Sequence, residues 1–93
     1  MALRIIVSRH PAAIGFIRSR DRRFSDAPVV AQATEDDVAG KIVAGNLPLR
    51  LAALAAEVIA VEFDGTPPRG QEYGLADMEA AGATLKSYVV RPG

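Results

Sequence analysis

The sequence has no cysteine and a single histidine, His10. Disulfide bonds and thiolate metal sites are therefore excluded, and one imidazole disfavours a zinc site. We expect no bound metal and no cofactor. No apolar run approaches the roughly 18 residues that a membrane-spanning helix needs, and the chain opens with a strand-like segment rather than a signal peptide. These absences predict a soluble, cytoplasmic protein that does not bind membranes.

Aromatic residues are scarce as well, at 5% of the chain, although 49% of the residues are hydrophobic. The core must then consist mainly of aliphatic side chains. The length of 93 residues predicts one small domain that covers residues 1–93. Because a short chain with so much aliphatic surface often completes its core across an interface, we expect a homodimer.

The chain also lacks net charge, which argues against a protein that binds long nucleic acids, since those carry a basic excess. The charges are unevenly placed, because residues 1–23 hold six arginines and one acid, Asp21. Two interpretations remain. This half of the chain could face a polyanion, or Arg18, Arg20, Arg22 and Arg23 could simply stabilise the negative end of a helix.

Apolar periodicity predicts strands that alternate with helices. This alternation is typical of an α/β fold, here a small Rossmann-like, mainly parallel sheet of about five strands with helices on both faces. The predicted elements are a strand at Arg4–Val7, a helix from Pro11 to about Arg20, a strand at Val29–Ala33, a capped acidic turn at Thr34–Asp37, a strand at Lys41–Ala44, a helix at Pro48–Val58, a strand at Ala60–Phe63, a helix at Leu75–Ala81 closed by Gly82, and an edge strand at Leu85–Arg91.

Polar residues stand between the first predicted strand and its helix, where Ser8, Arg9 and His10 precede Pro11. Proline suits the first helical position because the N–H that it lacks would have no partner there. Free N–H groups at a helix start attract anions, whereas the cation of Arg9 is electrostatically misplaced beside them. A bound phosphate would explain the arginine.

The stretch Gly45-Asn46-Leu47-Pro48 repeats this order of strand end, polar junction, proline and helix. Arg50 then falls in the first turn of the predicted helix, again a cation at a positive helix end. Ligand sites of parallel sheets lie beyond the carboxyl ends of the strands, near a reversal in strand order. We therefore expect both junctions to share one rim with Asp64 and Arg69, which follow the strand that ends at Phe63.

Each candidate also has a purely structural explanation. A hydrogen bond to the backbone would account for Ser8, helix capping for His10 and Asn46, and an exposed ion pair for Arg50. The residues alone leave both explanations open. P-loop and dinucleotide-binding fingerprints are absent.

Three separated blocks, which together span nearly the whole chain, resemble a family of CRISPR-associated proteins found with type III systems, the Csx-sixteen family. The chain departs from the family at Asn46, where the family has threonine, and in the last block, where the family has a more regular acidic helix. The blocks are Val7-Ser8-Arg9-His10-Pro11-Ala12-Ala13-Ile14, Gly45-Asn46-Leu47-Pro48-Leu49-Arg50-Leu51-Ala52, and Arg69-Gly70-Gln71-Glu72 followed by Asp77-Met78 and Ala81-Gly82-Ala83.

The resemblance implies a ring nuclease that cleaves cyclic oligoadenylate, foremost cyclic tetra-adenylate, and so switches off antiviral signalling. It also implies a homodimer with a fold related to the CARF domains that sense these rings. On this hypothesis Ser8, Arg9 and His10 are catalytic, and the reaction, attack by a ribose 2′-hydroxyl, needs no metal. The residues expected to bind the ring are Pro11, Gly45, Asn46, Leu47, Arg50, Asp64 and Arg69.

Two other functions remain compatible with the same residues. A non-catalytic protein that sequesters the ring would use the same cations and helix starts. A structural adaptor would use the aliphatic surface for a protein partner, and its polar rim would be incidental.

Overall fold

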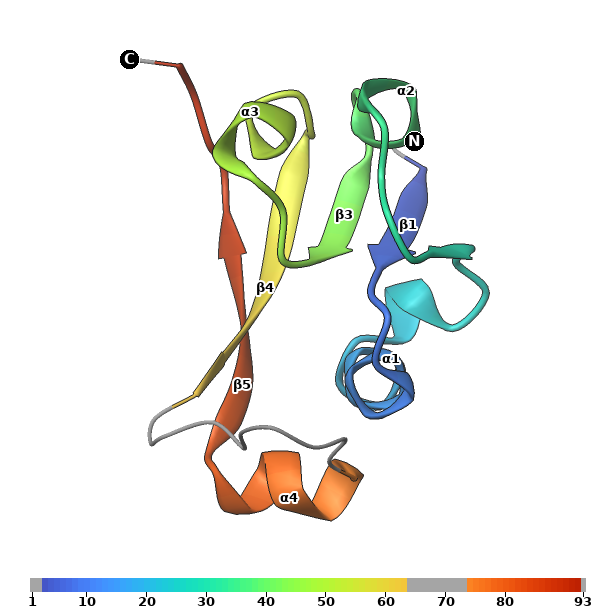
Figure 1. The fold of residues 1–93 in the computed structure, drawn as a ribbon, viewed down its shortest axis with the longest axis vertical. Coiled ribbons are helices and arrows are strands. Elements are labelled where there is room, and N and C mark those ends of the chain that lie inside the picture. The colour runs from blue at the N-terminus through green and yellow to red at the C-terminus, as the bar shows by residue number, and fades with distance from the viewer. Residues whose placement is uncertain (1–2, 64–73, 93) are drawn as a thin grey trace.

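A computed structural model describes residues 3–63 and 74–92 of the chain as one five-stranded sheet with helices packed against it (Figure 1). The strands are β1 (Arg4–Val7), β2 (Val29–Val30), β3 (Ile42–Gly45), β4 (Glu57–Phe63) and β5 (Ala83–Tyr88). They lie side by side in the order β2-β1-β3-β4-β5. The first four run parallel and β5 pairs antiparallel with β4, so the predicted mainly parallel sheet is confirmed.

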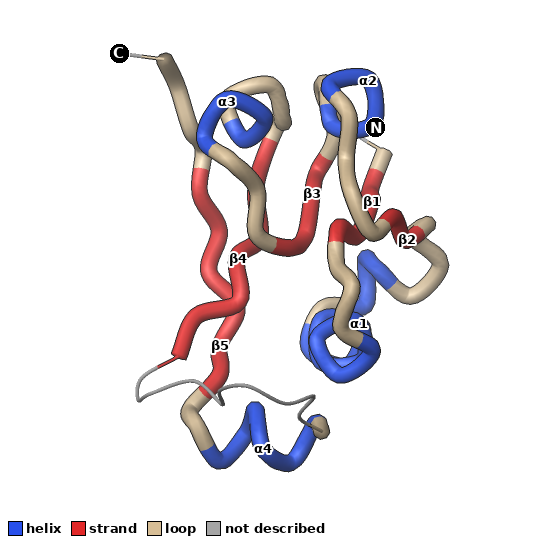
Figure 2. The backbone as a smooth tube through the Cα atoms, in the orientation of Figure 1, coloured by secondary structure: helices blue, strands red, loops and turns tan. Residues whose placement is uncertain are grey.

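Helices pack on both faces of the sheet, as predicted. One face is covered by α2 and α3 and the other by α1 and η1, while α4 packs against α1 and β5. Figure 2 shows the helices as separate short segments around the sheet. Their bounds are α1 (Pro11–Arg20), the 3-10 helix η1 (Arg22–Phe24), α2 (Glu35–Val38), α3 (Leu49–Ala52) and α4 (Leu75–Ala80).

The strands alternate their side chains between two apolar layers, because successive residues of a strand point to opposite faces. In β1, Ile5 and Val7 join the layer under α2 and α3, whereas Ile6 joins the layer under α1 and η1. All three side chains are buried. Both faces of the parallel strands are therefore covered, which is the usual arrangement of parallel sheets.

The first helix has the bounds that its sequence predicts, starting at Pro11 and ending at Arg20. The arginines at its end have structural partners. Arg18 donates to the carbonyl oxygens of Phe24 and Ala27 at 3.3 and 2.9 Å and thereby ties α1 to the turn after η1. In the described part of the chain, no helix is long and apolar enough to cross a membrane.

The acidic turn forms α2, a single helical turn with the predicted cap. The hydroxyl of Thr34 accepts a hydrogen bond from the N–H of Asp37, whose carboxylate accepts one from the N–H of Thr34. This reciprocal capping box satisfies two N–H groups at the helix start. Val38, at the other end of the turn, is fully buried and fastens α2 to the sheet.

The prediction of a helix at Pro48–Val58 is wrong beyond the first turn. α3 ends at Ala52, and β4 already begins at Glu57. The intervening residues bond to the strand beside them, since the N–H of Ala56 donates to the carbonyl of Lys41 at 2.8 Å. Val58, predicted on the helical stripe, is instead buried in β4, paired with Val43 of β3. Sheet pairing has therefore overridden the helical periodicity.

Several strand ends also differ from the predictions. β2 stops at Val30 rather than Ala33, β4 begins three residues before Ala60, and β5 spans Ala83–Tyr88 rather than Leu85–Arg91. The position of β5 at the edge of the sheet is confirmed. Gly82, which was expected to close the last helix, has φ +76°, the left-handed conformation typical of a helix end.

Candidate functional site

A cavity of about 250 Å³ lies beyond the carboxyl ends of β1, β3 and β4. The sheet reverses its strand order here, because β2 lies on one side of β1 and β3 lies on the other. The loops that follow β1 and β3 leave the sheet at the same end (Figure 2). Such a switch point is where open α/β sheets bind ligands.

The structure brings five of the candidate residues together around this cavity. Its polar lining comes from both junctions that the sequence singles out, and the remainder of the lining is apolar. The lining residues are Val7, Ser8, Arg9, His10, Ala13, Ile17, Ala31, Gly45, Asn46, Val61, Phe63 and Met78.

The junction between β1 and α1 is held by Ser8. Its N–H donates to the carbonyl of Val30 at 3.0 Å, and its Oγ accepts a hydrogen bond from the N–H of His10 at 3.1 Å. The structural explanation for Ser8 is therefore confirmed. Ser8 also lines the cavity, and a hydroxyl that accepts one hydrogen bond can still donate another to a ligand.

His10 is the N-cap of α1, but its side chain makes no capping hydrogen bond. Its carbonyl accepts the first helical bond, from Ile14, at 3.1 Å. The first-turn N–H groups of a helix have no partner within the helix, so those of Ala12 and Ala13 remain for a ligand or water. The exposed Pro11 fixes the helix start without lining the cavity.

Gly45 brings the end of β3 close to the end of β1. Its φ is +130°, and a Cβ at this position would lie 2.1 Å from the carbonyl oxygen of Val7. No side chain fits at that distance. The glycine therefore allows the two strand ends, and the polar loops that follow them, to meet at one cavity.

Asn46 is exposed at the cavity and does not cap α3. That helix has Pro48 as its N-cap and no side-chain capping bond, so the capping explanation for Asn46 is wrong. Leu47 is half-buried against the layer under α2 and α3 and is not part of the cavity lining.

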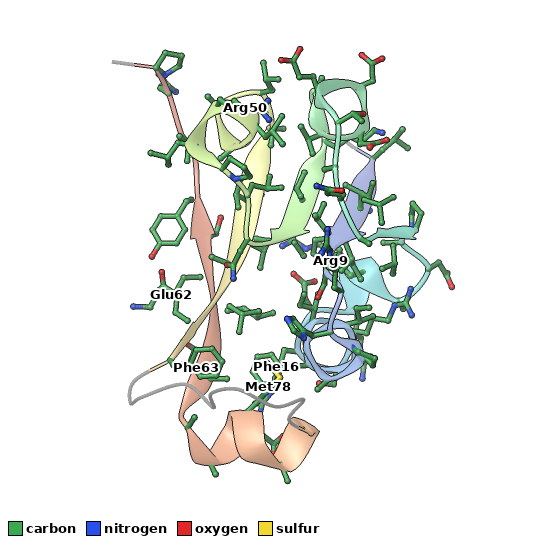
Figure 3. All side chains as sticks on the ribbon, in the orientation of Figure 1. Arg9, Phe16, Arg50, Glu62, Phe63 and Met78 are labelled. Carbon is green, nitrogen blue, oxygen red and sulfur yellow. The ribbon has the colours of Figure 1, made fainter. Side chains whose placement is uncertain are left out.

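Arg50 lies away from the cavity, contrary to the expectation of one shared rim. It lines a separate hollow with Leu49, Leu54, Val90 and others. Figure 3 shows Arg50 on α3 and Arg9 well apart at the end of β1. The reason is the path of the loop after β3, which runs back toward the other end of the sheet and places α3 beside the start of β4 (Figure 1). The candidates Asp64 and Arg69 fall outside the described residues.

Arg9 is the cation of this site. It is exposed, and among the described residues no ion pair involves it. By contrast, Arg20 pairs with Glu79 at 3.2 Å and Arg23 with Asp21 at 2.8 Å. No group of three potential metal ligands is present in the described part of the chain. The charge of Arg9 is therefore available to an anion.

A family model described as "Putative CRISPR-associated protein (Cas_VVA1548)" matches residues 5–91. The chain belongs to this family. The match includes both polar junctions and the apolar wall of the cavity. No curated protein and no solved structure matches the chain.

Sequence reasoning missed the apolar half of the site in this CRISPR-associated protein. Val61 and Phe63 reach the cavity from the end of β4, and Met78 reaches it from α4. The end of β4 follows the same rim rule that located Asn46, so Phe63 carried a usable signal. Met78 carried none, because a buried methionine on a short helix resembles any core residue.

The arrangement can hold a phosphorylated ligand. Arg9, the start of α1 and the polar groups of His10 and Asn46 are suited to phosphate oxygens. Val61 and Phe63, packed with the buried Met78, offer an apolar surface beside them. A ligand with an anionic group and a flat apolar part fits this division.

Proposed function

We propose that this CRISPR-associated protein is a ring nuclease that binds cyclic oligoadenylate, foremost cyclic tetra-adenylate, and cleaves it. The observation that carries the proposal is the meeting of Arg9, His10 and Asn46 with the start of α1 at the switch point of the sheet. The resemblance of the Ser8–Pro11 block to the Csx-sixteen family supports the choice of ring. Cleavage would end type III CRISPR signalling.

The proposed reaction is an in-line displacement within the substrate. A ribose 2′-oxygen forms a bond to the adjacent phosphorus while the bond from phosphorus to the 5′-oxygen breaks. The 2′-hydroxyl proton leaves with a base, and the 5′-oxygen gains a proton. The products are a 2′,3′-cyclic phosphate and a 5′-hydroxyl, and no metal is required in principle. The protein must align the hydroxyl and stabilise charge on the phosphate oxygens.

The residues divide these tasks according to their chemistry. Arg9 and the first N–H groups of α1 stabilise the developing negative charge. His10 assists proton transfer, because an imidazole can accept a proton from, or donate one to, a reacting group. Ser8 and Asn46 orient the ribose or the phosphate by hydrogen bonds.

The symmetry of the ring favours two copies of the chain for each ring. The cavity volume of about 250 Å³ is below the roughly 300 Å³ at which small-molecule pockets begin, and the ring contains four nucleotides, so one cavity does not enclose the whole ring. A two-fold homodimer would present two such cavities to a ring that itself has two-fold symmetry.

The direct test is incubation of the purified protein with labelled cyclic tetra-adenylate, with and without a metal chelator. We expect linear products with 2′,3′-cyclic phosphate ends under both conditions. If the ring stays intact in a stable complex with the protein, the result rejects the enzyme hypothesis in favour of a protein that sequesters the ring. Calorimetry that detects no ring binding would favour an adaptor.

Substitutions at the site test the division of tasks. We expect Arg9→Ala to lower the rate constant by about a hundredfold, as for loss of one donor to a developing oxyanion, and to weaken ring binding. His10→Ala should slow cleavage by only about tenfold, because alignment carries most of the effect. Arg91→Ala, an exposed arginine outside the cavity, is the matched control and should change neither quantity.

A further inference from the structure

The cavity has an apolar wall that the chemistry of phosphate cleavage does not use. Val61 and Phe63 share the face of β4 that is turned to α1, and Met78 joins them from α4. Figure 3 shows Phe63 and Met78 near one another between the end of β4 and α1, with Arg9 at the end of β1. The wall therefore lies opposite the polar junctions of the same cavity.

Phe63 is the phenylalanine with surface left for a ligand. The chain has three phenylalanines, and the other two, Phe16 and Phe24, have no exposed surface. Phe63 is only half-buried and lines the cavity. Met78 is fully buried behind it and supplies a polarisable thioether. An aromatic side chain placed in this way suits stacking with a flat ring.

We propose that this wall holds one purine base of the ligand, with the base on Phe63 and the adjoining phosphate at Arg9. This inference rests on the proposed function and adds to it the part of the ligand that the wall recognises.

The lining also decides how the base is recognised. Away from Ser8, Arg9, His10 and Asn46, the described lining side chains carry no hydrogen-bonding group. Stacking and contact area on the wall formed by Val61 and Phe63 then contribute most of the binding of the base. Adenosine and guanosine monophosphates should bind within about threefold of one another, and uridine monophosphate should bind more weakly than both.

Calorimetry with adenosine 5′-monophosphate and ribose 5-phosphate measures the contribution of the base. We expect the wild-type protein to prefer the nucleotide by at least about tenfold. Phe63→Leu should weaken nucleotide binding by about fivefold to a hundredfold, the usual range for loss of one stacking side chain. It should leave the affinity for ribose 5-phosphate unchanged. Phe24→Leu, a buried phenylalanine outside the cavity, is the control and should leave the preference for the nucleotide unchanged.

Two results would overturn the inference: equal binding of both probes by the wild-type protein, or an equal loss for both probes in Phe63→Leu. The second would show that Phe63 only supports the fold. Parallel assays of cyclic tetra-adenylate separate this inference from the proposed function. If the protein cleaves the ring but does not prefer the nucleotide to ribose 5-phosphate, only the proposed base-binding wall is rejected. If it prefers the nucleotide but does not cleave the ring, only the proposed nuclease activity is rejected.

Discussion

Gly45 shows how one residue positions two loops at the candidate site. Its left-handed conformation and its contact with the carbonyl of Val7 leave no space for a side chain. Gly15, in the middle of α1, is the opposite case, because a Cβ there would have no neighbour within 4 Å. The two glycines therefore differ in what they contribute to stability.

We predict that Gly45→Ala lowers the free energy of unfolding by more than about 2 kcal/mol, since backbone strain and a displaced strand end both oppose folding. Gly15→Ala should raise it by about 0.5 to 1 kcal/mol, because alanine is the better helix former. Urea titration of both variants gives the comparison. Equal effects would contradict the close approach of β1 and β3.

Asp21 gives the fold a specific response to acid. Its carboxylate accepts hydrogen bonds from the side chain and the backbone N–H of Arg23, at 2.8 and 3.0 Å. The hydrogen bond with the Arg23 side chain is the main cause that lowers the pKa of Asp21 below its usual 3.8. A lowered pKa stabilises the folded state above pH 3.8, and this stabilisation is lost as the pH falls through the lowered value.

We predict that Asp21→Asn destabilises the protein by less than about 1 kcal/mol at pH 7, because the pair is partly exposed. The difference from the wild type should shrink as the pH falls through the lowered pKa of Asp21, because the wild-type carboxyl then becomes protonated as well. Unfolding curves of both proteins across this range measure it. A difference that persists in acid would assign the effect to packing instead.

The polar half of the site could be predicted from single residues, whereas the only signal for the apolar half was the position of Phe63 at the end of a strand. Ser8, Arg9 and His10 are conspicuous because polar side chains interrupt an apolar strand just before a proline. Phe63 and Met78 line the same cavity, but apolar side chains have the same sequence pattern in a cavity wall as in a core. Only the packing of α4 on α1 distinguishes the two.

At the scale of elements, α1 and α3 show when local sequence decides structure. α1 has its proline at the first position and arginines in the last turn, and these signals mark its two ends. The longer helix predicted after Pro48 had an apolar stripe but no signal for its end. Val58 and Ile59 are β-branched and pair with β3, so they belong to strand β4 and not to a helix. Periodicity alone cannot detect that competition.

The docking of α4 depends on packing rather than charge. Met78 is fully buried against Phe16, whereas the Arg20–Glu79 pair between the same helices is half exposed. We predict that Met78→Ala lowers the free energy of unfolding by about 2 to 5 kcal/mol. Glu79→Gln should lower it by less than about 1 kcal/mol. Thermal and urea unfolding of both variants test this order, and the reverse order would contradict it.

At the scale of the whole molecule, the strand order explains why two distant junctions meet. The chain crosses from β2, on one side of β1, to β3 on the other, and this reversal opens a crevice at their carboxyl ends. The alternation of strands and helices in the sequence predicted that the polar junctions lie at one rim of the sheet, although it did not give the strand order. It could not predict that Arg50 lies elsewhere, since that depends on the path of a one-turn helix.

We predict that one cyclic tetra-adenylate binds two chains, because the ring has two-fold symmetry and two chains related by a two-fold axis would offer it equivalent sites. Native mass spectrometry should show two subunits with one ring. Analytical ultracentrifugation at increasing ring concentration provides an independent measurement. A complex of one chain with one ring would contradict the two-fold arrangement.

The antiparallel direction of β5 determines where fusion partners can be attached. Leu3 lies beside the start of β3, where its carbonyl accepts a hydrogen bond from the N–H of Ile42, and Pro92 lines the same hollow as Leu49 of α3. The first and last described residues are therefore both at the end of the sheet remote from the cavity (Figure 1). An affinity tag, a fluorophore or a tether to a sensor chip at either terminus would leave the ligand entrance open to solution.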